Sequence, residues 1–216
     1  EIRNCDWSSD VCSSDLDFFK LKVIYGKARR LFDYSGAINR GADADINLTS
    51  LAGSKNGLWD LTVGGSFISK YQQYTGPIDN FPSVVNAYAG RMELNHAVFS
   101  IDAEYVVKTA DPNLLNNFKF DKGRSLQING TITKNNFGAS FSYRGIYNMN
   151  FMNDRNEEFT SLAPVNYIPA LTKQHDYLTG NIYVYAAQLK GETGFQADVF
   201  YRSEEHSLNS SHSSVS

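Results

Sequence analysis

The sequence lacks any apolar run of 18 residues and contains only five prolines and two cysteines. Without such a run, no segment is expected to cross a bilayer as a transmembrane helix. The first residues also show neither the basic stretch nor the apolar stretch of a secretory signal peptide. Aromatic residues make up 13% of the chain, and 16 glycines stand against the five prolines, a composition that suits an all-β protein.

Both cysteines, Cys5 and Cys12, lie in the segment CDWSSDVCSSDL, which allows three interpretations. A pair of cysteines at this spacing could close a small disulfide loop in an exported protein. The aspartates of the segment could offer oxygen ligands to a metal, although the glycine and the terminal glutamate of a calcium loop are missing. The third interpretation, an origin outside the gene, comes from the genetic code.

The two ends of the chain can be encoded by DNA strings that are reverse complements of each other. Codons for residues 11–16, read on the opposite strand, spell the Arg-Ser-Glu-Glu-His of residues 202–206. With one base dropped, codons for residues 6–11 spell residues 207–212 in the same way. No requirement of a folded protein produces this relationship, and both ends resemble translated sequencing adapter.

We therefore predict that residues 1–16 and 202–216 are adapter-derived tails and that residues 17–201 are the native body. The body carries 18 Lys and Arg side chains against 17 Asp and Glu, so its formal net charge is +1, compared with −3 for the whole chain. It contains no cysteine, and no disulfide or metal site is expected in the tails. We expect the body to be an internal piece of a longer chain.

Apolar and polar residues alternate along the body, as in strands whose successive side chains point to opposite faces. In the segment 59–71, the apolar face contains Trp59, Leu61, Val63, Gly65, Phe67 and Tyr71. The segments 99–108 and 137–147 follow the same rule. With the segment 20–31 included, the pattern predicts about eight to nine strands, the first and last of them cut by the ends of the body.

Long and short connections alternate between these strands. The long ones are expected at 32–41, 72–85, 109–124 and 148–176, and the short ones at 52–57, 95–97, 134–136 and 190–192. Strands of ten residues, tilted by roughly 45°, span the core of a bilayer. The pattern predicts an all-β fold, an antiparallel up-and-down transmembrane β-barrel present as an incomplete fragment. A soluble β-sandwich is the alternative, since its core and solvent faces alternate in the same way.

Five stretches of the body carry a family resemblance. They are VIYGKARRLFDYSGAINRGADADINL (23–48), LTVGGSFISKYQ (61–72), MNFMNDRNEEF (149–159), VNYIPALTKQHDY (165–177) and GETGFQADVFY (191–201). These stretches resemble a family of Bacteroidota outer-membrane β-barrel proteins of unknown function. The resemblance implies an outer-membrane location and a barrel larger than this fragment. It implies no activity and no catalytic residues.

No catalytic constellation is visible in the body, and we expect no enzyme, no cofactor, no metal site and no nucleic-acid partner. His96 lies in an expected tight turn, where a solvated side chain is the simplest interpretation. His175 and Asp176 are neighbours, but adjacent strand residues point to opposite faces and would not form a catalytic pair. The run NDRNEE (153–158) is expected to be a solvated loop, and PVNYIPAL (164–171) to pack as part of a plug or lid.

Charged residues on the polar faces of the strands are the candidate lumen-lining residues. They are Asp60, Lys70, Arg91, Glu93, Asp102, Glu104, Lys108 and Arg144. Barrel interiors are polar, so we expect Asp43, Asp45 and the other acids to pair with bases such as Lys70, Arg91 and Arg144, or with water, rather than to act in catalysis. Charges of both signs argue against a strongly ion-selective pore.

These observations lead to a non-enzymatic β-barrel in the outer membrane of a Gram-negative bacterium. We expect a channel or uptake barrel for small polar solutes, with outer-membrane lipid around it. A structural or ligand-binding surface barrel with a closed lumen is the alternative, and a soluble binding domain is a weaker one. An outer-membrane hydrolase would need a cluster of Ser, His and acid at the rim, which the sequence does not show.

Overall fold

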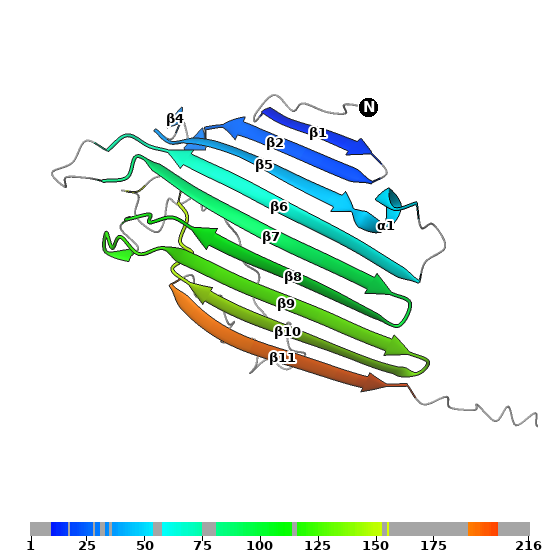
Figure 1. Ribbon diagram of the computed structural model, residues 1–216. Helices are drawn as coiled ribbons and strands as arrows, with labels where there is room; N and C mark the ends of the chain where they lie inside the picture. Colours follow the sequence, from blue (N-terminus) through cyan, green and yellow to red (C-terminus); the bar gives the residue numbers. More distant parts are fainter. Residues whose placement is uncertain are drawn as a thin grey trace, which may run out of the picture.

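The computed structural model describes residues 10–16, 18–27, 29–30, 33–34, 36–53, 58–74, 81–113, 116–152, 155 and 190–202. Nine strands form one antiparallel sheet in the order β1-β2-β5-β6-β7-β8-β9-β10-β11 (Figure 1). Their bounds are β1 (Asp10–Leu16), β2 (Phe19–Gly26), β5 (Ile38–Asn47), β6 (Trp59–Tyr71), β7 (Val84–His96), β8 (Phe99–Lys108), β9 (Gly123–Lys134), β10 (Phe137–Tyr147) and β11 (Gly191–Tyr201). The connection from β2 to β5 contains a small hairpin of β3 (Arg29–Arg30) and β4 (Asp33–Tyr34).

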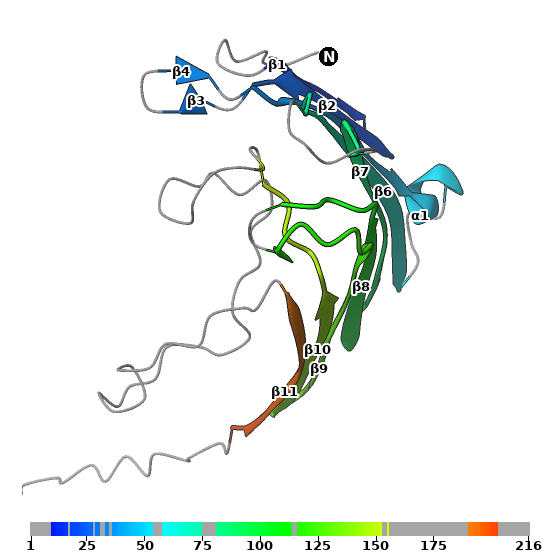
Figure 2. The same cartoon turned by 90° about the vertical axis from the view of Figure 1, so that its left-hand side faces the viewer.

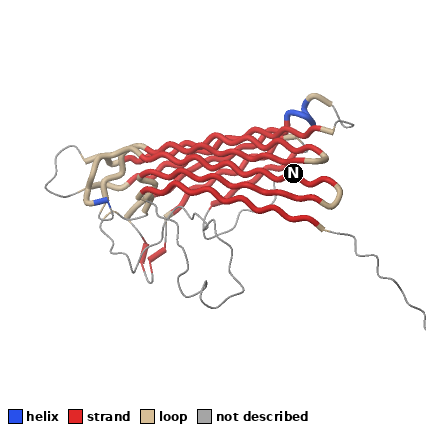
Figure 3. The backbone as a smooth tube through the Cα atoms, turned by 90° about the horizontal axis from the view of Figure 1, so that it is seen from below, coloured by secondary structure: helices blue, strands red, loops and turns tan. Residues whose placement is uncertain are grey.

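The predicted all-β fold of antiparallel strands is confirmed, and the expected alternation of long and short connections holds from β6 to β10. Two residues, Asn135 and Asn136, join β9 to β10, and Asn135 has a positive φ of 52°, which asparagine tolerates in tight turns. The described parts of the long connections gather at the opposite end of the sheet (Figure 3). We call the two ends of the sheet the turn end and the loop end.

Two expected short connections differ in the structure. The β5–β6 connection begins with the helix α1 (Leu48–Leu51), because the side chain of Asn47 accepts a hydrogen bond from Ser50 N and caps the helix. The expected turn at 190–192 is wrong, since β11 begins at Gly191 and this residue pairs with Tyr147 of β10. The preceding segment 177–189 lies outside the described residues.

Part of the expected N-terminal tail is a strand. All seven residues of β1, Asp10–Leu16, pair with β2, so this stretch is joined to the sheet through the main chain. Main-chain pairing to an exposed sheet edge depends little on the side chains of the added strand. The pairing therefore places residues 10–16 in the sheet without testing whether they are native.

The sheet is strongly curved and has a concave and a convex face (Figure 2). The described parts of the β8–β9 and β10–β11 connections lie on its concave side (Figure 2). Lys70 of β6 reaches Asp111 in the first of these connections, which assigns Lys70 to the concave face. Since side chains alternate along a strand, the cross-strand register then assigns every other strand residue to one face. The described strands do not close into a ring, and β1 and β11 form the two edges.

Candidate functional site

The concave face collects most of the charged side chains of the sheet. All eight candidate lumen-lining residues lie on it according to the register, namely Asp60, Lys70, Arg91, Glu93, Asp102, Glu104, Lys108 and Arg144. Alternation alone assigned these residues to one side of each strand, and the register of five strands places them on a common surface. This concave surface is the candidate functional site.

An ion-pair network crosses the middle of the concave face from β5 to β7. Arg91 Nη1 lies 2.7 Å from Asp43 Oδ1, and Arg91 Nη2 lies 2.6 Å from Asp45 Oδ1. Ser66 on the intervening strand donates to Asp43 at 2.6 Å and accepts from Arg91 at 2.7 Å. The expected pairing of Asp43 and Asp45 with a base on the same face is therefore confirmed for Arg91.

A second group of acids lies toward the turn end, where amides rather than cations contact them. Asp60 accepts a hydrogen bond from Asn47 at 2.7 Å, and Asp102 accepts one from Asn129 at 2.7 Å. Within the described part of the chain, no ion pair involves Asp60, Glu93, Asp102 or Glu104. The pairing expected for Asp102 and Glu104 is thus absent among the described residues.

A cavity of about 440 Å³ opens over these acids, a size within the range of small-molecule sites. Phe18, Phe19 and Lys20 at the start of β2 form one side of it. Strands β5 to β8 form its floor, and the acids there are Asp45, Asp60, Glu93, Asp102 and Glu104. The curvature of the sheet brings β2 to the same cavity as β8, although three strands separate them.

The loop end of the concave face is covered by a packed group of connections. We call residues 109–113, 116–122 and 148–152 together with Arg155 the loop plug. Lys70 donates from Nζ to Asp111 Oδ1 at 2.9 Å and to Met152 O at 2.8 Å. Both side chains of the Lys70–Asp111 pair are fully buried, with 0% exposure each. The loop plug is therefore attached to β6 by a buried ion pair.

Arg155 joins the loop plug to the β6–β7 connection. Its guanidinium lies over the ring of Phe81 at 4.9 Å, its Nη2 donates to Pro82 O, and its Nε lies 3.7 Å from Asp111. Phe81 in turn contacts the rings of Phe118 and Phe120, with centroid distances of 6.3 and 5.8 Å. The expectation of a solvated loop at 153–158 is wrong for Arg155, which is buried because three connections pack around it.

Two further cations of the concave face are buried near the loop plug. Lys108 donates from Nζ to Asn150 O, and its side chain is almost fully covered. Arg144 forms an ion pair with Glu192 of β11 at 3.8 Å. These side chains lie on strands, as the sequence indicated, but their partners come from a loop and from a neighbouring strand.

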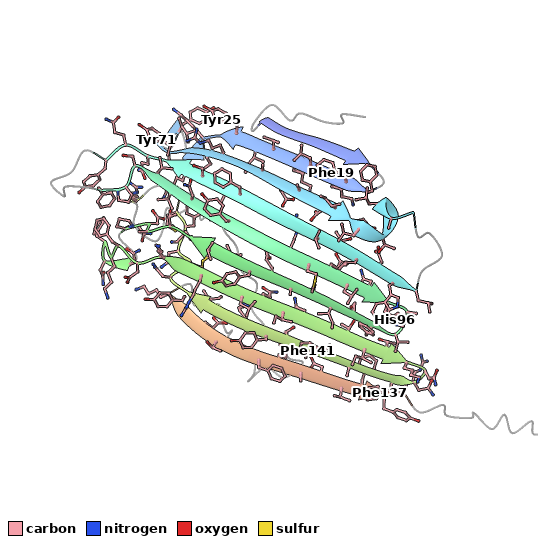
Figure 4. All side chains as sticks on the ribbon, viewed as in Figure 1. Phe19, Tyr25, Tyr71, His96, Phe137 and Phe141 are labelled. Atoms are coloured by element: carbon pink, nitrogen blue, oxygen red, sulfur yellow. The ribbon has the colours of Figure 1, made fainter. Side chains whose placement is uncertain are left out.

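The convex face is apolar and exposed. Its aromatic residues lie at both ends and in the middle of the strands: Figure 4 labels Phe19 and Phe137 at the turn end, Tyr25 and Tyr71 at the loop end, and Phe141 between them. At the turn end, Trp59 packs against His96 and Phe99, with centroid distances of 4.6 and 5.5 Å. His96 is the last residue of β7 and not part of the turn as expected, and its half-buried ring packs against Trp59 and Phe99. At the loop end, Arg124 lies over the ring of Tyr147 at 5.8 Å.

The sequence pattern did not single out Asp111 and Arg155, because both lie in expected loops. A buried loop carboxylate has no periodic pattern, and only the run Asp111-Pro112-Asn113 within a long connection sets it apart from the surrounding residues. His175 and Asp176 lie outside the described residues. In the described part of the chain, no group of three or more His, Cys, Asp or Glu side chains is arranged to hold a metal ion. No described helix is long and apolar enough to cross a membrane.

These features define an all-β protein built on one curved antiparallel sheet, with a charged concave face and an apolar convex face. The chain belongs to DUF6029, a family of unknown function, whose model matches residues 10–212. No curated protein and no solved structure matches the chain.

Proposed function

We propose that this chain forms part of a β-barrel in the outer membrane of a Gram-negative bacterium of the Bacteroidota. The barrel admits small polar solutes along the concave face. The observation that carries the proposal is the division of the sheet into an exposed apolar face and a charged face. Lipid covers an outward apolar band in such barrels, while their interior is polar.

The convex face supplies the apolar band. Large apolar side chains with exposures between 37% and 72% occur on it in every strand from β6 to β11. Examples are Phe67, Tyr88, Met92, Tyr105, Ile132, Phe137 and Val199. A water-soluble protein rarely exposes so wide an apolar surface. A sandwich would need a second sheet over this surface, and the one other sheet among the described residues is the hairpin of β3 and β4.

Strand dimensions agree with this proposal. Strands β6 and β7 contain 13 residues each, and the other strands from β5 to β11 contain 10 to 12. Tilted strands of about 9 to 11 residues cross a bilayer core. Without β1, which lies in the expected adapter-derived tail, eight strands remain, and β2 and β11 do not pair with each other, so the proposed barrel needs strands beyond those described.

A closed barrel that binds a ligand or serves a structural role is the second candidate. The loop plug favours it, because packed connections cover the loop end of the concave face. The cavity over the acids at the turn end would then be a binding site for a small polar solute rather than a section of a passage. Both candidates share the barrel and the membrane, and they differ in whether solute passes through.

Two measurements test the proposal in sequence. The protein, purified with detergent and added to lipid vesicles, should insert and run on gels at a mobility that changes on heating. A chain that stays soluble and monomeric without detergent would refute the barrel. Planar-bilayer recording of the inserted protein then separates the candidates, since discrete conductance steps support a channel and their absence at every voltage supports the closed barrel.

A further inference from the structure

Burial changes along the concave face from one end to the other. Toward the turn end, Glu93, Glu104 and Thr131 are exposed. Toward the loop end, Val85 has 0% and Ala87 has 7% exposure, although both point to the concave side of a single-layer sheet. The loop plug lies at this end. Lys70 and Lys108, which contact it, pair across the strands with Val85 and Ala87. The plug thus covers the loop half and leaves the turn half open.

Among the described residues, an ion pair and hydrogen bonds of Lys70 and Lys108 attach the loop plug to the wall. The buried apolar side chains in the described part of the plug are Pro112, Met149, Phe151 and Met152. Against these stand the fully buried Asp111 and the cations Lys70 and Arg155 that it contacts at 2.9 and 3.7 Å. Removing one partner of a buried ion pair is strongly destabilising, because the other charge then stays buried without its counter-charge. Loss of a single charge can therefore release the loop plug from the wall of the sheet.

Asp111 occupies the centre of this arrangement. Lys70 belongs to the wall strand β6, whereas Arg155 belongs to the β10–β11 connection, and one carboxylate from the β8–β9 connection contacts both. Without its charge, Lys70 and Arg155 would lose the carboxylate that both contact, and the seated position would lose that favourable interaction. We propose that the loop plug is a releasable gate latched by Asp111, which closes the loop end of the concave face.

The proposal rests on the proposed barrel only for the passage of solute. Seating of the plug is a property of the chain alone and can be measured by thiol accessibility. In a background with Cys5 and Cys12 replaced by serine, Ala87→Cys places a small thiol under the plug. Thr131→Cys places a thiol on the exposed turn half and serves as the accessible reference. A charged methanethiosulfonate reagent then reports whether each position is covered.

With Asp111 intact, labelling at position 87 should be slow and labelling at position 131 fast. Asp111→Asn should accelerate labelling at position 87 by about ten-fold or more, since removing one partner of a buried pair raises the population of the open state. Asp121→Asn is the matched control, because Asp121 is an exposed acid of the same connection and the described contact it makes is through its main-chain oxygen. This control should leave both rates unchanged.

Fast labelling at position 87 with Asp111 intact would overturn the seated plug. Equal rates in Asp111→Asn and Asp121→Asn would overturn the latch. Far-ultraviolet circular dichroism identifies a variant that fails to fold, and Lys70→Met then repeats the test from the other partner of the pair. The same acceleration in Lys70→Met supports the latch, and an unchanged rate in a folded Lys70→Met protein overturns it.

Conductance separates this inference from the proposed function. If Asp111→Asn accelerates labelling and also raises single-channel conductance or open time, both the gate and the channel are supported. If labelling accelerates while no conductance appears, the plug is latched as proposed and the barrel is closed by other means. The two proposals can therefore fail independently.

Discussion

Arg91 and Asp45 form an ion pair directly across a glycine. Arg91 lies on β7 and Asp45 on β5, and Arg91 donates from Nε to Asp45 Oδ1 at 2.8 Å. Gly64 of β6 pairs with both residues in the register, and the two side chains meet above it. A β-carbon at position 64 would lie 2.1 Å from Asp45 Oδ1 and 2.7 Å from Arg91 Nε. A β-carbon at position 64 would therefore force the side chains of this pair to shift.

Replacing Gly64 by alanine should displace this ion pair. We expect Gly64→Ala to lower the free energy of unfolding by about 1–3 kcal/mol, because the added methyl overlaps atoms that cannot all move without breaking the network. Urea unfolding in lipid vesicles measures the change. Gly90→Ala is the matched control, since a β-carbon there meets nothing within 4 Å. Equal effects of the two substitutions would show that the pair does not depend on Gly64.

A positive charge on the convex face of β7 should impair membrane insertion, whereas one on the concave face of the same strand should not. Met92 lies on the convex face near the middle of β7, and Glu93 is its neighbour on the concave face. If lipid covers the convex face, Met92→Lys should cost about 2–4 kcal/mol on insertion into vesicles, while Glu93→Lys should insert normally. The yield of protease-protected, heat-modifiable protein measures both. Similar yields for the two variants would argue against lipid on the convex face.

Trp59 should lie in the membrane interface at the turn end. It is half exposed and packs against His96, and tryptophan prefers the headgroup region of a bilayer. In a Trp7→Phe background, lipids brominated near the headgroup should quench its fluorescence more strongly than lipids brominated near the chain ends. Quenching by neither lipid would place Trp59 in water and contradict the proposed orientation of the sheet.

The gene itself tests the origin of the tails. We expect genomic DNA from the source to encode residues other than those at 1–16 and 202–216 on either side of the body. The pairing of residues 10–16 with β2 does not alter this expectation, because a sheet edge accepts a strand mainly through its main chain. An intact genomic reading frame that includes both tails would disprove the adapter interpretation.

Alternation allowed most of the strands to be predicted, because the direction of successive side chains in a strand is a local property. Segments such as 59–71 and 137–147 coincide with β6 and β10. The errors lie where local pattern is weak. The start of β11 at Gly191 depends on pairing with Tyr147, and α1 depends on the Asn47 cap, so neither follows from alternation.

The candidate site was predictable as a set of residues but not as a set of contacts. Arg91 was a plausible partner for Asp43 and Asp45 because all three carry charge on the polar side of their strands. Asp111 was not, because it lies in a connection whose path is determined by packing with Arg155 and Lys70. Contacts between distant segments have no periodic signal in the sequence.

By itself, the sequence determined that this protein is made of long antiparallel strands with one apolar and one polar face. Those properties follow from residue alternation and from the spacing of polar connections. Only the tertiary structure decided that the polar faces form one concave surface, that Gly64 makes room for the Arg91–Asp45 pair, and that Asp111 is buried beside Lys70. These features depend on register and curvature, which bring together residues from separate strands and connections.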